Sequence, residues 1–154
     1  MTIDDLKVLM DEFDPAALLP QIDTIVGKVE LAARIAVMIG PIILLALGLA
    51  YTFLSPKEAN YHFGYRCYFG MGSVNAWRFS QRLAGIAWSV LGLVLTVVML
   101  LVCGGFRGKE IMDILGSAVK CVLWEAGLTA AVCLVINTVV AFRYDRQGEL
   151  RARK

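Results

Sequence analysis

The residues of this chain that could do chemistry are concentrated between His62 and Gly85. Arg66 is a fixed cation whose guanidinium group can bind several carbonyl groups or one phosphate in a fork. Gly64, two residues earlier, permits a tight backbone turn, and Tyr65 stands between them. These residue types predict recognition of a polar or anionic group.

The second half of this stretch predicts the start of a helix. Ser73 or Asn75 can cap a helix that begins near Ala76. Its first turns would be amphipathic and carry Trp77, Arg78, Gln81 and Arg82. A tryptophan at this position suits the lipid headgroup region, and two arginines four residues apart would face anionic lipid or polar solvent.

Catalysis and metal binding have little support. His62 is the only histidine, and the chain contains no H-E-x-x-H, G-x-S-x-G or P-loop pattern. The four cysteines form no C-x-x-C pair and no zinc spacing. We therefore expect no enzyme activity, no cofactor, no bound metal and no nucleic-acid partner.

Composition predicts an all-α integral membrane protein. Of the 154 residues, 58% are hydrophobic and 18% are charged, against about 45–50% and roughly 25% in soluble domains. A membrane domain over residues 31–142 would contain three transmembrane helices, at about 31–54, 83–102 and 114–142. Residues 55–82, here called the signature loop, connect the first two spans. Gly40–Pro41 would kink the first span, and Gly85, Ser89 and Gly92 would let another helix approach the second closely.

The two ends of the chain differ in charge. Residues 1–30 carry seven acidic residues against two lysines and predict an amphipathic helical segment, with Asp14–Pro15 at a helix start. This segment would lie on the bilayer surface or pack against the spans; alternatively it would dock a partner or a second protomer. Residues 143–154 form a basic tail, with five basic residues against two acidic ones.

Three polar residues interrupt the last predicted span. Lys120 can extend to the interface beside Trp124. Glu125 lies deeper, where a carboxylate is costly unless it is paired, protonated or hydrated, and Asn137 is the third. A transporter or channel would use these residues as a polar track, but three spans would need an oligomer to enclose a pathway.

The distribution of lysine and arginine predicts the orientation. The side with the N-terminus and the 103–113 turn has five: Lys7, Lys28, Arg34, Arg107 and Lys109. The other side has nine: Lys57, Arg66, Arg78, Arg82, Arg143, Arg146, Arg151, Arg153 and Lys154. We therefore expect the signature loop and the C-terminus to be cytoplasmic.

The signature loop resembles that of the SdpI family of bacterial membrane proteins. The shared pattern is Gly64-Tyr65-Arg66, a tryptophan eleven residues after the arginine, and Arg78-Phe79-Ser80-Gln81, placed between membrane helices with two spans following. The pattern departs from the family where Cys67 replaces the usual threonine and where Ser80-Gln81 replaces alanine–asparagine.

The resemblance implies a multi-pass protein of the bacterial inner membrane that protects its cell against a membrane-active peptide toxin, or that signals through a regulator. Gly64, Arg66 and Trp77 would be central to that function. A non-catalytic, partner-binding subunit of a membrane complex is the alternative, and an oligomeric transporter or channel is the second. The expected partners are the lipid bilayer and a peptide toxin, a regulator, another membrane subunit or a second copy of the chain.

Overall fold

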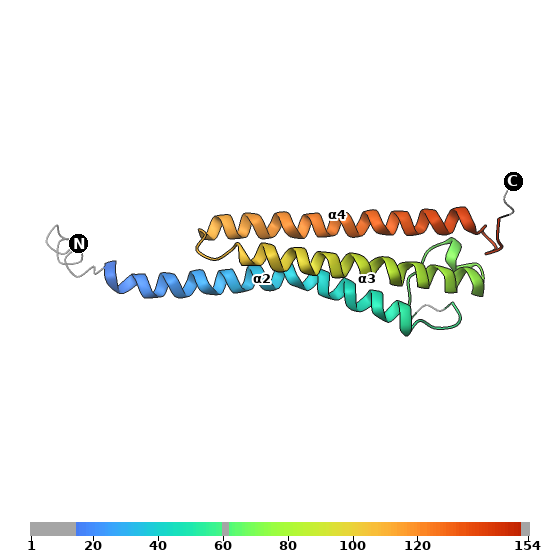
Figure 1. The fold of residues 1–154 in the computed structure, drawn as a ribbon, viewed down its shortest axis with the longest axis horizontal. Coiled ribbons are helices and arrows are strands. Elements are labelled where there is room, and N and C mark those ends of the chain that lie inside the picture. Colours follow the sequence, from blue (N-terminus) through green and yellow to red (C-terminus); the bar gives the residue numbers. More distant parts are fainter. Residues whose placement is uncertain (1–14, 60–61, 152–154) are drawn as a thin grey trace, which may run out of the picture.

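The computed structural model describes residues 15–59 and 62–151. Three long helices account for most of them: α2 (Pro15–Phe53), α3 (Val74–Gly104) and α4 (Ile111–Arg143). A short 3₁₀ turn, η1 (Phe69–Met71), lies in the signature loop. The helices run side by side in an elongated bundle (Figure 1), and α2 and α3 share the most extensive contact. The fold is all-α, as the composition predicts.

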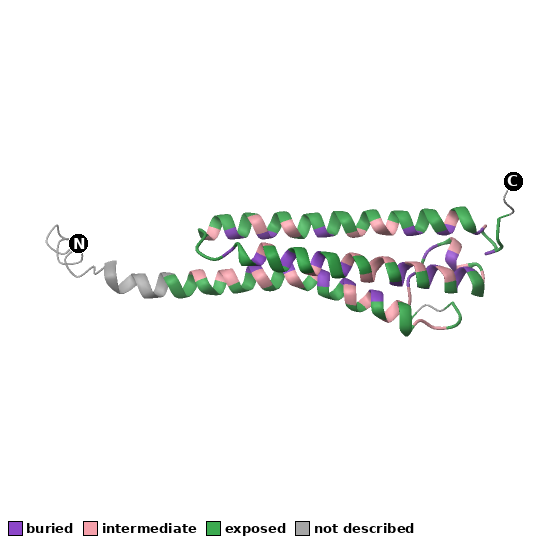
Figure 2. Ribbon diagram, viewed as in Figure 1, coloured by how far each residue is buried: buried purple, intermediate pink, exposed green. Residues whose placement is uncertain are grey.

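All three helices are long and apolar enough to cross a membrane. The 31 residues of α3 span about 46 Å at 1.5 Å per residue, more than the roughly 30 Å hydrocarbon core of a bilayer. Exposed residues cover most of the helix surfaces, with buried ones confined to the facing sides (Figure 2). Many of those exposed side chains are leucine, isoleucine and valine, which lipid tails would solvate. The chain is a multi-pass membrane protein.

Small residues bring α2 and α3 together. A Cβ atom on Gly92 would lie 2.5 Å from the backbone nitrogen of Leu45, and one on Gly85 would lie 2.8 Å from that of Thr52. Neither distance is physically possible, so both positions require glycine at this helix separation. The predicted close approach along Gly85 and Gly92 is confirmed, and α2 is the helix that uses it.

The helix ends differ from the predicted boundaries. Residues 15–30 are helical and continue into the first span without an end at residue 30; Asp14 and the rest of residues 1–14 lie outside the described residues. Across that boundary Arg34 forms an ion pair with Glu30, one turn earlier. The helix also continues through Gly40–Pro41, and Figure 1 shows α2 changing direction near its middle.

The second and third spans are longer than predicted. Residues 74–82 of the signature loop are already the first turns of α3, which begins well before residue 83. Similarly, α4 begins at Ile111 and ends at Arg143, beyond the predicted bounds of 114–142 at both ends.

Candidate functional site

The signature loop lies at one end of the bundle, where α2 ends, α3 begins and α4 ends (Figure 1). Its chain leaves α2 at Phe53 and passes through η1 before it enters α3 at Val74. Because three helix ends and the C-terminal segment meet there, the loop can be fixed from several sides.

Gln81 fixes the loop backbone at Tyr65. The Tyr65 backbone N–H donates to Gln81 Oε1 over 2.7 Å, and Gln81 Nε2 donates to the Tyr65 carbonyl over 2.6 Å. The side chain of Gln81 is 1% exposed. Gln81 therefore does not share the exposed face of Arg78 and Arg82; its amide satisfies a buried stretch of loop backbone.

Trp77 is also buried, with 0% exposure. Its indole nitrogen donates to the carbonyl of Pro56 over 2.9 Å. The prediction of a headgroup-facing tryptophan is therefore wrong. Trp77 instead fills the space beneath the loop and attaches it to α3.

Gly64 is required by both backbone and space. Its φ is +126°, a value that residues with a Cβ rarely adopt. A Cβ there would lie 2.7 Å from Trp77 Cζ2 and 2.9 Å from Gln81 Oε1. The predicted tight turn at Gly64 is thus observed, and it directs the chain over the Trp77 ring.

Tyr65 joins the loop to α4. Its hydroxyl donates to Asn137 Oδ1 over 2.9 Å and lies 3.2 Å from the Cys133 carbonyl. Burial raises the pKa of the Tyr65 hydroxyl above its ordinary value. The ring packs edge-on against Trp88, whose own ring contacts Tyr51 on α2. Tyr65 therefore contacts α3 and α4 directly and is linked to α2 through Trp88.

Ser73 links α3 to the C-terminal segment. Its hydroxyl accepts from the Ala76 N–H over 3.1 Å, so Ser73 is the helix cap, and it donates to the Gly148 carbonyl over 2.7 Å. Asn75 is exposed in the first turn and is not the cap. Residues 144–150 form a tight turn closed by a Tyr144–Leu150 bridge. The charges of residues 143–154 predict only a basic tail, and no residue pattern there indicates this turn.

Cationic side chains lie on the outside of this assembly. Arg66, Arg78 and Arg82 are exposed. Arg78 donates to the Lys57 carbonyl over 3.3 Å. Among the described residues, no hydrogen bond or ion pair holds the Arg66 guanidinium group. Arg66 is therefore free to bind an anionic or carbonyl-bearing group, on a loop held rigid by its buried neighbours.

Cys67 follows Arg66 and points inward. It is 9% exposed, and burial raises the pKa of its thiol. A shallow cavity of about 300 Å³ lies beside it, lined by residues of the loop and of α4: Cys67, Tyr68, Phe69, Asn137, Thr138 and Ala141. The thiol is a space-filling group here, because a protonated, buried thiol is a poor nucleophile.

The three polar residues of α4 do not form one track. Successive helical residues are about 100° apart, so Lys120, Glu125 and Asn137 project in three directions. Lys120 is exposed, Glu125 is buried, and Asn137 is bonded to the signature loop. Among the described residues no hydrogen bond or ion pair joins any two of them.

The fold and this site define a small multi-pass, α-helical membrane protein. Its distinguishing element is a polar loop at one end of the bundle, held in place by buried side chains beneath it. A model of the SdpI/YfhL protein family matches residues 57–143, which is more than half of the chain and includes most of the signature loop, α3 and α4. The protein belongs to the SdpI/YfhL family. The comparisons with curated proteins and with solved structures each returned no match.

Proposed function

We propose that this protein protects a bacterial cell against a membrane-active peptide toxin, acting from the inner membrane and without catalysis. Family membership over residues 57–143 carries the proposal. The loop geometry supports it, because a rigid loop that presents an exposed guanidinium suits recognition, and cationic arginine binds carbonyl and carboxylate groups well. The proposed partner is the peptide itself.

Substitutions at Arg66 and Trp77 distinguish a loss of binding from a loss of folding. Arg66 is exposed and holds nothing in the described structure, so Arg66→Ala should reduce protection while leaving thermal stability unchanged. Trp77→Ala should lose protection because the protein unfolds, since removing a buried tryptophan costs about 3–5 kcal/mol. Arg107→Ala is the matched control: Arg107 is also exposed, but it lies in the α3–α4 turn at the opposite end of the bundle.

The experiment compares survival of cells with and without the gene when they are exposed to a panel of membrane-active peptides from the producer and its neighbours. Protection by the wild type and by Arg107→Ala, with loss in Arg66→Ala, is the expected result. Equal sensitivity of the two strains to every peptide would overturn the proposal. Co-purification of a regulator or another membrane subunit without any protection would favour a partner-binding subunit instead.

We also propose that the signature loop and the C-terminus face the cytoplasm. The nine-to-five distribution of lysine and arginine supports this orientation. Cys67 is buried and therefore a poor reporter. Ala59→Cys in the loop and Arg107→Cys in the opposite turn are substitutions at exposed positions, to be tested with Cys121 and Cys133 replaced by alanine. An impermeant thiol reagent added to intact cells should label position 107 and not position 59; the reverse pattern would place the loop outside.

A further inference from the structure

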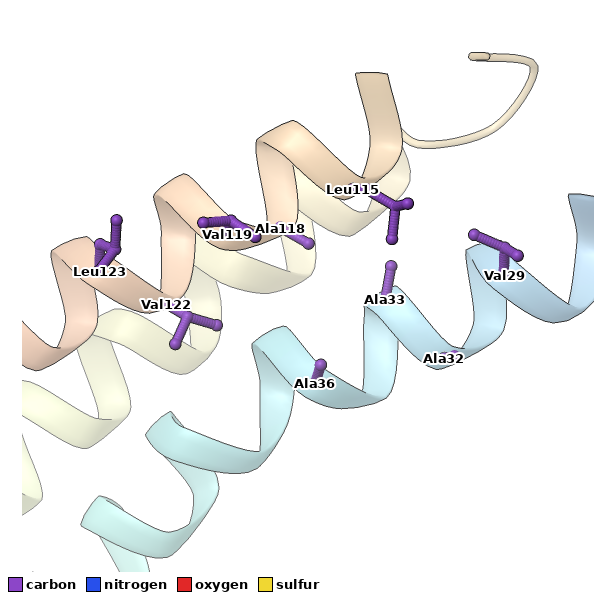
Figure 3. Close-up of a pocket in the computed structure, with 9 residues that line it drawn as sticks. All are labelled: Val29, Ala32, Ala33, Ala36, Leu115, Ala118, Val119, Val122 and Leu123. Atoms are coloured by element: carbon purple, nitrogen blue, oxygen red, sulfur yellow. The ribbon is translucent and has the colours of Figure 1, made fainter. Parts of the chain in front are cut away.

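A groove runs between α2 and α4 on the lipid-facing side of the bundle. It contains two cavities. The first, of about 470 Å³, is walled entirely by small and branched apolar side chains such as Ala32, Ala36 and Val119 (Figure 3). The second, of about 590 Å³, continues from it, since Val122 lines both. Each has a volume in the range of small-ligand sites.

Two residues that line the second cavity each have a polar atom without a hydrogen-bond partner among the described residues. Glu125 is 7% exposed, and its Oε1 has no partner among the described residues. Its other oxygen faces Gly40, where a Cβ would lie 2.6 Å away. The buried indole nitrogen of Trp88 is also without a partner, and Trp88 lines the same cavity. Buried polar groups are almost always bonded. Both atoms are enclosed by protein here, so a molecule in the cavity would bond them once it draws either side chain toward it.

The depth of Glu125 restricts what that occupant can be. It lies 14 residues after Ile111, about 21 Å along α4 at 1.5 Å per residue, and therefore within the hydrocarbon core. Lipid tails offer no hydrogen bonds at this depth. A phosphate-bearing headgroup would place its own negative charge beside the carboxyl group, and the nearest arginine along α2, Arg34, is already paired with Glu30.

The complementary molecule has an apolar body, a cationic donor for the carboxyl group and an acceptor for the indole N–H. A peptide that enters the membrane supplies all three: apolar side chains, a lysine ammonium group and carbonyl groups. We propose that the α2–α4 groove binds a membrane-inserted apolar peptide segment, with one lysine ammonium at Glu125 and an acceptor at Trp88 Nε1. The inference rests on the proposed function in one respect: that function makes a peptide toxin the natural source of the segment.

A defined probe can test this without the natural toxin. The probe is a synthetic leucine–alanine peptide of about 20 residues, long enough to span the bilayer, with one central lysine and a fluorophore. Its matched control replaces that lysine with leucine. Energy transfer to a labelled full-length protein in neutral phosphatidylcholine vesicles measures association of each peptide.

The expected result is that the wild type binds the lysine peptide at least about tenfold more tightly than the leucine peptide, and that Glu125→Gln loses this preference. Ala126→Leu, which fills the groove, should weaken binding of both peptides. Ala131→Leu is the matched control, because Ala131 is also an exposed alanine of α4 but is not among the groove-lining residues. Thermal unfolding of each variant in the same vesicles verifies that it is folded.

Equal binding of the two peptides, or an unchanged preference in folded Glu125→Gln, would overturn the inference. If Ala126→Leu instead changes the oligomeric state and not peptide binding, the groove is a contact between copies of the chain, and the inference is again wrong. These failures are distinct from failure of the proposed function. If the Glu125→Gln variant protects cells as well as the wild type does, the proposed function stands and the inference about this site is wrong. If the wild type prefers the lysine peptide but never protects cells, the site stands and the proposed function is wrong.

Discussion

The side-chain amide of Gln81 pairs with the backbone of Tyr65 through two hydrogen bonds, of 2.7 and 2.6 Å. The amide offers one acceptor to the Tyr65 N–H and one donor to the Tyr65 carbonyl. A neighbouring strand in a sheet would satisfy the same two backbone groups. Because Gln81 projects from α3, this pairing fixes the position of the signature loop relative to that helix. The exposed Arg66 is the next residue along, so its position depends on the same pair.

Replacing Gln81 tests this pairing. Gln81→Leu would leave the Tyr65 N–H and carbonyl buried and unpaired, at a cost of about 2–4 kcal/mol for the two groups. Gln81→Glu keeps an acceptor, and it keeps a donor only while its carboxyl group is protonated. Its effect should therefore be smaller than that of leucine in the protonated state. Thermal unfolding in detergent, followed with a thiol-reactive dye that detects the buried cysteines, measures both. Asn75→Ala, at an exposed position, should unfold as the wild type does. An unchanged midpoint for Gln81→Leu would show that the pair adds nothing to stability.

Gly64→Ala separates backbone strain from steric clash. The substitution forces a Cβ into a φ of +126° and toward the Trp77 ring, and we expect it to destabilise the protein by more than the roughly 1–3 kcal/mol of backbone strain alone. Gly108→Ala is the comparison, because its φ is +76° and a Cβ there would meet nothing within 4 Å. The same dye assay should give a clearly larger loss for position 64. Equal losses would mean that contact with Trp77 is unimportant.

The bond between the Tyr65 hydroxyl and Asn137 couples the loop to α4. Tyr65→Phe and Asn137→Ala should each destabilise the protein by about 0.5–1.5 kcal/mol, and the double variant should cost less than their sum, because both remove the same bond. Thr138→Ala, paired with Tyr65→Phe, is the control: no hydrogen bond joins these two side chains in the described structure, so their effects should add. Additive effects for Asn137 as well would contradict the coupling.

Much of the fold was predictable because it depends on local properties. Long apolar runs predict the three spans, and the small residues Gly85 and Gly92 predict a close helix contact. The sequence also predicts a helix cap at Ser73 or Asn75, and Ser73 is the one that caps. Each of these signals lies within a few residues of its consequence. The capping bond, for example, joins residues only three apart.

The candidate site was less predictable because its contacts are long-range. Tyr65 and Asn137 are 72 positions apart, and Ser73 and Gly148 are 75 apart. Residue type placed Trp77 at the membrane surface, where tryptophan is common, and gave no sign that Gln81 would be buried beside it. Their burial results from the loop folding back over them, which depends on the turn at Gly64 and could not be read from their own positions.

Burial of Cys67 predicts a dependence of stability on pH. The pKa of its thiol is raised in the folded protein above the ordinary value of 9.0, so the folded state holds this proton more tightly than the unfolded state. Below about pH 9 the thiol is protonated in both states, and its contribution is constant. As pH rises further, the unfolded thiol ionises first, and the free energy of unfolding falls until the folded pKa is passed.

Cys67→Ala removes this group and should flatten part of that fall. Denaturant unfolding at several values between about pH 7 and 11, in detergent, compares the variant with the wild type. The raised pKa of the Tyr65 hydroxyl contributes a similar fall at higher pH, and because Cys67 is one of the causes of that raised pKa, part of this fall is removed together with the thiol. The alanine variant should be less stable at about pH 7, because it loses buried sulfur contacts, and the difference should shrink above about pH 9. A difference that stays constant across the range would mean that the folded Cys67 thiol ionises as readily as the unfolded one.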